Sequence, residues 1–99
     1  MSNLHLQVLA LFIINRGGTY ANTYRLWRVM SMFDVYSEEV IADLQFNEYV
    51  NTTLEDQINY YYITAAGKKF MNENASEARD VLEKQFPDKA ELIHALIHF

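Results

Sequence analysis

The sequence predicts an α+β domain in which a short β-hairpin lies between two groups of helices. Apolar residues recur at helical spacing before residue 47 and after residue 64. Between them, two runs rich in Tyr, Val, Ile and Thr occupy residues 48–53 and 58–63, and these residue types suit a half-buried strand. The 99 residues, 51% of them apolar, are the amount of chain that one domain with one core needs.

The first helix is predicted over residues 3–16. Nine of the eleven residues from Leu4 to Ile14 are apolar, so little of its circumference is polar. Such a helix must be buried by its own domain, by a partner subunit, or by both. Gly17 and Gly18 then end it, because glycine adopts the left-handed conformation of a helix C-cap without a steric penalty.

A second helix is predicted over residues 23–32, after a short extended piece at Thr19 and Tyr20. Asn22 is a suitable N-cap for this helix, since its side chain can accept a backbone N–H of the first turn. The apolar residues fall on one broad face, and Trp27 is placed in the core with them. A turn at residues 34–37 follows.

A third helix is predicted from Ser37, as its N-cap, to about residue 47. Two acidic residues in its first turn suit the positive end of the helix dipole. The residues expected to face inward are Val40, Ile41, Leu44 and Phe46.

The hairpin is predicted to have a connection of four or five residues, with the polar loop 54–57 between its two strands. Thr64 follows the second strand and is a suitable N-cap for a helix over residues 65–74. Ser76 can cap a further helix that ends near Pro87, because proline disfavours the helical conformation in the residue before it. Asp88 and Glu91 have the spacing of a capping box at the start of a last, strongly apolar helix.

The pattern "Tyr-Val, hairpin, Tyr-Tyr-Ile-Thr-x-x-Gly-Lys-Lys-Phe" over residues 49–70 resembles the wing of winged helix-turn-helix domains, especially MarR-like and PadR-like regulators. The resemblance implies a three-helix core plus a β-hairpin wing over residues 1–74. Residues 75–99 would then be a C-terminal helical extension that packs on the domain or forms a dimer interface. The resemblance also implies a DNA-binding transcriptional regulator that dimerises through its first helix and its C-terminal helices. In that case the third helix would enter the major groove.

Charge is unevenly distributed along the chain. Residues 1–33 contain three arginines and no acid, whereas residues 34–67 contain seven acids and no Lys or Arg; the net charge of the whole chain is −5. Duplex DNA is a polyanion that binds clustered Lys and Arg favourably, so the acidic third helix and wing favour a second function. In this alternative the scaffold is a protein-interaction module that binds a basic protein partner, with an acidic surface that could mimic the charge of DNA.

Each function has its own candidate residues. The basic residues able to contact DNA phosphates are Arg16, Arg25, Arg28, Lys68 and Lys69. The residues expected at a protein interface are Glu38, Glu39, Asp43, Glu55, Asp56 and Tyr61, because tyrosine is enriched at interfaces and carboxylates suit a basic partner.

The sequence contains few features that indicate other classes of function. There is no cysteine, glycine-rich phosphate loop or nucleophile motif, so neither an enzyme nor a cofactor is expected. Glu91, His94 and His98 could share one side of the last helix, but this spacing favours surface or interface histidines over a metal site. The longest apolar run, residues 8–14, is too short to span a membrane, and a cytoplasmic location is expected.

Overall fold

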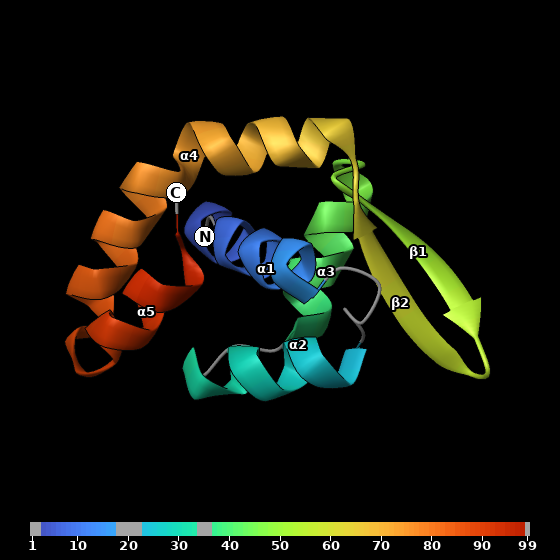
Figure 1. Cartoon of the computed structure of the whole chain (residues 1–99), viewed down its shortest axis with the longest axis horizontal. Coiled ribbons are helices and arrows are strands. Elements are labelled where there is room, and N and C mark those ends of the chain that lie inside the picture. Colours follow the sequence, from blue (N-terminus) through green and yellow to red (C-terminus); the bar gives the residue numbers. More distant parts are fainter. Residues whose placement is uncertain (1–2, 18–22, 34–36, 99) are drawn as a thin grey trace.

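Helix α1 (Leu4–Gly17) lies at the centre of the fold, with the other helices around it (Figure 1). The computed structural model describes residues 3–17, 23–33 and 37–98, and for residues 17, 23–25 and 37 it describes the backbone alone. The eight consecutive residues from Gln7 to Ile14 are all buried within the single chain. The domain itself therefore buries this helix, and residues 7–14 leave no exposed apolar stripe for a partner subunit.

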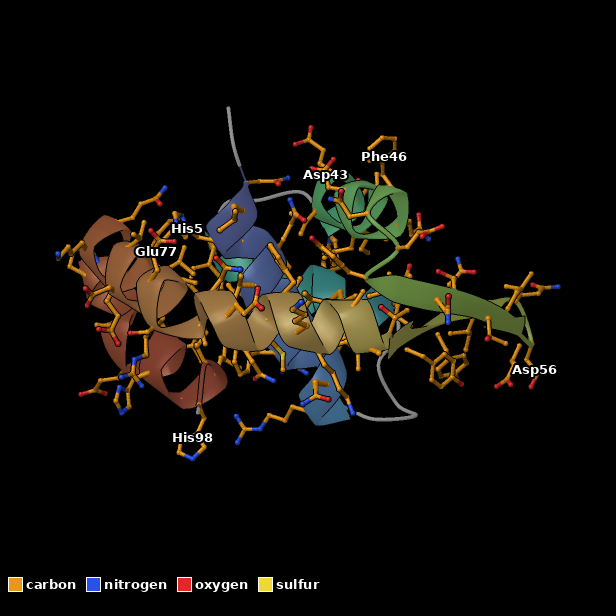
Figure 2. All side chains as sticks on the ribbon, turned by 90° about the horizontal axis from the view of Figure 1, so that it is seen from above. His5, Asp43, Phe46, Asp56, Glu77 and His98 are labelled. Carbon is orange, nitrogen blue, oxygen red and sulfur yellow. The ribbon has the colours of Figure 1, made fainter. Side chains whose placement is uncertain are left out.

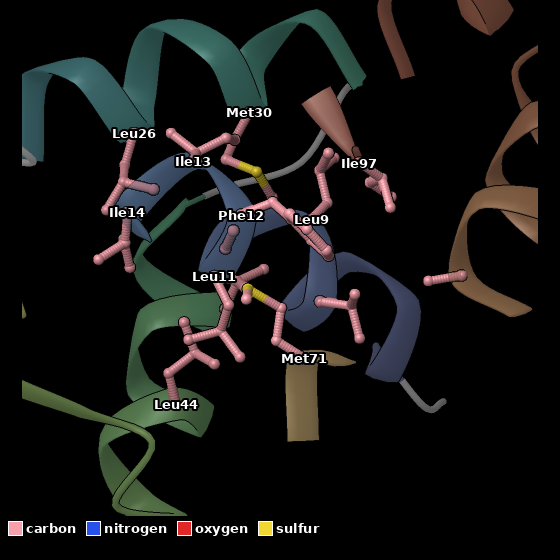
Figure 3. Close-up of a cluster of buried hydrophobic side chains, with 14 of the residues drawn as sticks. Leu9, Leu11, Phe12, Ile13, Ile14, Leu26, Met30, Leu44, Met71 and Ile97 are labelled. Carbon is pink, nitrogen blue, oxygen red and sulfur yellow. The ribbon is translucent and has the colours of Figure 1, made fainter. Parts of the chain in front are cut away.

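Apolar side chains from all faces of α1 form the centre of the core. Figure 3 shows Leu9, Ile13 and Leu11 of α1 among apolar side chains from four other helices. These side chains are Leu26 and Met30 of α2 (Thr23–Met30), Leu44 of α3 (Ser37–Phe46), Met71 of α4 (Ala65–Gln85), and Ile97 directly after α5 (Ala90–Leu96). Because all sides of α1 are covered, the surrounding elements are fixed relative to one another through it.

The elements follow one another in an order that is compatible with a winged-helix-like topology. In the described residues, three α-helices and one 3-10 helix come first, then an antiparallel two-stranded hairpin, then a long α-helix and a short one with a 3-10 helix between them. Their bounds are α2 Thr23–Met30, the 3-10 helix η2 Ser31–Phe33, α3 Ser37–Phe46, β1 Val50–Glu55, β2 Ile58–Ile63, α4 Ala65–Gln85, the 3-10 helix η3 Pro87–Lys89 and α5 Ala90–Leu96. The fold is thus a small α+β domain, as the sequence predicts. The strand expected at Thr19 and Tyr20 and the cap expected at Asn22 lie outside the described residues.

One narrow face of α2 and η2 packs on the core around α1. Leu26, Met30 and Phe33 are spaced by four and three residues and are fully buried. The prediction that Trp27 belongs to the core is wrong, since its side chain is 56% exposed. Trp27 follows Leu26 by one residue, so it lies about 100° around the helix from the buried stripe.

Helix α3 buries Val40, Ile41 and Leu44 as predicted, but its last residue does not face inward. Phe46 is 87% exposed. It comes two residues after Leu44, a rotation of about 200° around the helix, which places it on the opposite face. The prediction for Phe46 is therefore wrong for a geometric reason.

A Schellman motif ends α3. The backbone N–H of Tyr49 donates to the carbonyl of Leu44 at 2.9 Å, and that of Glu48 donates to the carbonyl of Gln45 at 3.1 Å. Glu48 adopts a φ of 60°, the left-handed conformation that this motif requires and that glycine usually supplies. The motif turns the chain from α3 directly into β1.

The connection of the hairpin has two residues and not four or five, because β1 lies two residues nearer to the turn than the predicted 48–53. Strand β1 extends to Glu55, which pairs with Ile58, so that only Asp56 and Gln57 form the turn. Both turn residues have positive φ, 50° and 67°, as a type I′ turn requires. Such a turn matches the twist of the two strands, which allows the pairing to continue to the tip.

The start of α4 is fixed against the end of α3, and it confirms the predicted cap. The side chain of Thr64 accepts the backbone N–H of Gly67 at 3.0 Å, and its hydroxyl donates to the carbonyl of Glu48 at 2.8 Å. The ring of Phe70 stacks on that of Tyr49 with centroids 4.4 Å apart. These contacts hold the hairpin of β1 and β2, which we call the wing, at a defined angle to the helices.

The long helix α4 runs without a break through the position where the sequence predicts one. Its buried stripe of Met71, Ala75, Ala78 and Leu82 keeps helical spacing across residues 74–76. The side chain of Asn74 donates to the carbonyl of Phe70 inside the helix. The predicted new start at Ser76 is therefore wrong, because continuous burial outweighs the local capping tendency of these polar residues.

The C-terminal segment packs back on the same core. Ile93 and Ile97 are fully buried, and the ring of Phe86 meets that of Phe33 edge to face with centroids 5.3 Å apart. The predicted boundary at residue 74 falls within α4. The capping box predicted from Asp88 does not form, since α5 begins after Lys89 without a side-chain cap and Asp88 pairs with Lys89. Within the described residues, no helix combines the length and apolarity needed to cross a membrane.

Candidate interaction surface on helix α3 and the wing

The outer face of α3 carries acidic residues and one large aromatic residue. Glu38, Glu39 and Phe46 are exposed, and Asp43 is half-buried. Figure 2 shows Asp43 and Phe46 on the outer edge of α3, where Phe46 points away from the other helices and Asp43 lies toward the start of α1. An apolar ring thus lies one helical turn from a carboxylate on the same edge.

Asp43 is held in place by a chain of polar side chains from the start of α1. The side-chain amide of Asn3 donates to Oδ2 of Asp43 at 2.5 Å, and the amide of Gln7 donates to Oδ1 of Asn3 at 2.5 Å. This chain crosses from α1 to α3 and fixes the orientation of one carboxylate group. Asp43 is therefore both a structural link and a charged group at the edge of the surface.

A side-chain hydrogen bond joins α3 to the wing. Nε2 of Gln45 donates to Oγ1 of Thr52 at 2.9 Å. Thr52 lies on the same face of the hairpin as Val50 and Leu54, since successive strand residues alternate between faces. The bond therefore links α3 to the face of the hairpin that carries Leu54.

The distal half of the wing extends beyond the core and exposes apolar and acidic residues together. Leu54 is 67% exposed on the face that also carries Val50 and Thr52, whereas Glu55 and Ile58, which is 43% exposed, lie on the opposite face and Asp56 is exposed in the turn. Figure 2 shows Asp56 at the far end of the hairpin, away from the helices. Burial therefore decreases along the wing from Val50 to its tip, because the tip has no helix behind it.

We call these residues of α3 and the hairpin the α3–wing surface. It combines five carboxylates with two exposed apolar side chains, and residues 37–63 contain no Lys or Arg that could neutralise them. Its members are Glu38, Glu39, Asp43, Phe46, Leu54, Glu55 and Asp56. The exposure of Phe46 and Leu54 was not predicted, although the two-residue step from Leu44 to Phe46 indicates that these two side chains lie on opposite faces of the helix.

Tyr61 is not part of this surface. The sequence predicts it at a protein interface, but it is 4% exposed and belongs to the core, facing the same way as Val50 and Ile63. Tyr60 and Tyr62, which alternate with it, lie on the other face of the hairpin and are half-buried.

The basic residues expected at DNA come from elements that lie apart. Arg28 is exposed on α2, and Lys68 and Lys69 are exposed on α4; Figure 1 shows these two helices on opposite sides of α1. Lys69 also lies 4.0 Å from Glu73. The side chain of Arg25 is outside the described part of the structure.

Arg16 lies far from the acidic edge of α3. Asp43 contacts Asn3 at the start of α1, whereas Arg16 is thirteen residues further along the same helix. At a rise of 1.5 Å per residue the two ends are about 20 Å apart. Arg16 instead donates a hydrogen bond from Nη1 to the carbonyl of Ala95 at the end of α5, 2.9 Å away.

The histidines have separate partners. His5 lies 3.7 Å from Glu77, and His94 lies 3.7 Å from Glu83. Among the described residues, no three His, Asp or Glu side chains gather as a metal site would require. Glu91, His94 and His98 thus do not come together as a ligand set, despite their spacing in the sequence.

Comparisons of the sequence with protein-family models and with curated proteins, and of the structure with solved structures, find no match. The arrangement of charge, exposure and hydrogen bonds in this chain therefore carries the functional argument.

Proposed function

We propose that this protein is a protein-interaction module on a winged-helix scaffold, and that its α3–wing surface binds a basic partner. The observation that carries the proposal is Phe46, an aromatic side chain 87% exposed on a helix edge that also carries Asp43. Aromatic residues are enriched at protein interfaces and supply much of the binding free energy there. A partner that buries Phe46 and neutralises the carboxylates around it fits this edge.

The exposed apolar residues extend from the helix to the wing. Leu54 lies two residues from Thr52 on the same face of the strand, and Thr52 is hydrogen-bonded to Gln45 beside Phe46. A single partner segment that lies along α3 and the wing can therefore contact both Phe46 and Leu54. The brace between Gln45 and Thr52 reduces the conformational entropy that binding would otherwise cost.

The charge of this surface opposes a phosphate backbone. Residues 37–63 contain six acidic residues and no Lys or Arg. In water, a carboxylate and a phosphate about 6 Å apart repel each other by about 0.7 kcal/mol, and several such pairs add. The same field attracts Lys and Arg of a protein partner and accelerates its association.

A DNA-binding regulator is the second candidate, and the order of the elements favours it. In winged helix-turn-helix proteins the helix in the place of α3 enters the major groove. In this chain the phosphate contacts would come from Arg28, Lys68 and Lys69, all of which are exposed. Dimerisation would have to use surfaces other than the buried residues 7–14 of α1.

Site-specific photo-crosslinking tests the first candidate. The photoreactive amino acid p-benzoylphenylalanine replaces Phe46 in one variant and Lys84, exposed on α4, in the control variant. In cells of the source organism we expect the first variant to crosslink one protein through a segment rich in Lys and Arg, and the control not to. A protein crosslink from both positions, or from neither, would contradict the proposal.

A DNA titration separates the two candidates. Fluorescence anisotropy with a labelled mixed-sequence duplex at about 20 mM salt favours any electrostatic binding. The interaction module is expected to leave the anisotropy unchanged. An affinity that weakens steeply as salt is added would establish the regulator instead.

A further inference from the structure

A hollow of about 340 Å³ lies away from the α3–wing surface, where the end of α1 meets α4 and the end of α5. It opens to solvent on one side, and its size is near the lower end of the range for small-molecule sites. The residues that line it are Phe12, Asn15, Arg16, Met71, Asn72, Leu96 and His98.

The floor of the hollow is apolar and belongs to the core. Phe12 of α1 and Met71 of α4 are both buried, and Leu96 of α5 is half-buried beside them. A thioether next to an aromatic ring adapts its shape to a ligand and contacts another ring favourably. The floor therefore suits an apolar group of modest size.

The rim of the hollow is polar and carries one full charge. Arg16 supplies it, and none of the residues that line the hollow is acidic. This differs from the chain as a whole, whose net charge is −5. A positively charged group over an apolar floor, without a lining carboxylate, is the arrangement that binds an amphipathic anion.

Arg16 is oriented by a neutral partner. Its Nη1 donates to the carbonyl of Ala95 at 2.9 Å, which uses one of the five N–H donors of the guanidinium group. A carbonyl restricts the side chain but does not cancel its charge. The planar group can then form two parallel hydrogen bonds to a carboxylate in the hollow.

Further polar side chains stand at the opening. Asn15 and Asn72 are exposed on α1 and α4, and each amide can donate and accept hydrogen bonds. Figure 2 shows His98 projecting from the end of α5, on the side of the molecule where α1 ends. These groups come from three elements and converge on the same opening.

We propose that this hollow binds a small monocarboxylic acid with an apolar body. The carboxylate accepts hydrogen bonds from Arg16, and the body lies on Phe12, Met71 and Leu96. The site is separate from the surface proposed to bind a protein, so either can fail without the other.

A pair of probes of almost identical shape tests the site. 3-Phenylpropanoate and its neutral amide, 3-phenylpropanamide, are titrated into the ¹⁵N-labelled full chain at neutral pH and followed by NMR. We expect the acid to shift the backbone amides of Arg16, Asn72 and Leu96 saturably, and the neutral amide to bind at least tenfold more weakly. No saturable shift with the acid, or equal affinity for the two probes, would overturn the proposal.

Variants identify the group that carries the charge. Arg16→Gln is expected to weaken binding of the acid about tenfold or more, while Arg16→Lys retains part of it. The control Arg28→Gln, an exposed arginine on α2, leaves the affinity unchanged. Arg16→Gln with wild-type affinity contradicts the assignment.

Asn72→Asp provides a test that does not depend on the link between Arg16 and α5. Asn72 is exposed, so the substitution places a negative charge at the opening without disturbing the core. It is expected to weaken binding of the acid and leave the weak binding of the neutral amide as it was. A loss of both to the same degree would indicate a change of structure and would count against the carboxylate contact.

Discussion

Gly67 lies directly against the backbone of Tyr49. A Cβ atom at Gly67 would stand 2.2 Å from the carbonyl oxygen of Tyr49 and 2.9 Å from Cγ1 of Ile63. That carbonyl already accepts the N–H of Thr64, so it cannot move without disturbing the junction between the wing and α4. The short segment from Thr64 to Phe70 therefore joins three elements through one cap, one close approach and one ring stack.

Gly67→Ala tests this close approach. We expect it to lower the free energy of unfolding by about 1–3 kcal/mol, as overpacking does, measured by urea denaturation. The control is Ala66→Ser, an exposed neighbour in the same helical turn, with little expected effect. Equal stability of Gly67→Ala and wild type would show that the backbones are not in contact.

The positive φ values predict sites where glycine stabilises the fold. At Glu48, with φ 60°, and at Gln57, with φ 67°, a residue with a Cβ bears a steric cost that glycine lacks. Glu48→Gly and Gln57→Gly are each expected to raise the free energy of unfolding by up to about 1 kcal/mol. Glu55→Gly, in an extended strand, is the matched comparison and should destabilise; the opposite ranking in urea denaturation would refute the turn geometry.

Thr64→Ala removes the cap of α4 and a second hydrogen bond to Glu48. A lost cap costs about 1 kcal/mol, and the melting temperature should fall accordingly. Thr64→Ser keeps the hydroxyl group and should retain most of the stability. If both variants melt at the same lowered temperature, the methyl group and not the hydroxyl is responsible.

Substitutions at Phe46 and at Leu44 should differ strongly in their effect on the free energy of unfolding. Phe46→Ser is expected to change the free energy of unfolding by less than about 0.5 kcal/mol, because the ring is exposed. Leu44→Ala should cost about 2–5 kcal/mol, since Leu44 is fully buried. A large loss of stability in Phe46→Ser, by chemical denaturation, would mean that the ring packs inside the fold.

Charge reversal on α3 tests whether its outer face is accessible to a polyanion. Glu38 and Glu39 are both exposed, so the double variant Glu38→Lys, Glu39→Lys should gain nonspecific affinity for duplex DNA that falls steeply with salt. Anisotropy titrations at low and moderate salt measure this gain. An unchanged affinity would indicate that the face is covered, for example by a second copy of the chain.

Local rules in the sequence determined much of the architecture. The nearly continuous apolar run of α1, the apolar periods of α2 and α3, the two strand runs and the Thr64 cap could be predicted because each depends on residues within one helix or one pair of strands. The α+β class followed from their order. The acidic character of α3 and the wing was likewise present in the sequence before any packing was known.

Tertiary structure decided the features that depend on which elements pack against each residue. It exposed Trp27 and Phe46, buried Tyr61, and carried α4 through the polar positions at 74 and 76, because burial against α1 outweighs a local capping preference. It also covered α1 within one chain and brought Arg16 to the end of α5, 79 residues away in the sequence. No pattern within a single helix reports such contacts, since they arise from the free energy of burying several elements at once.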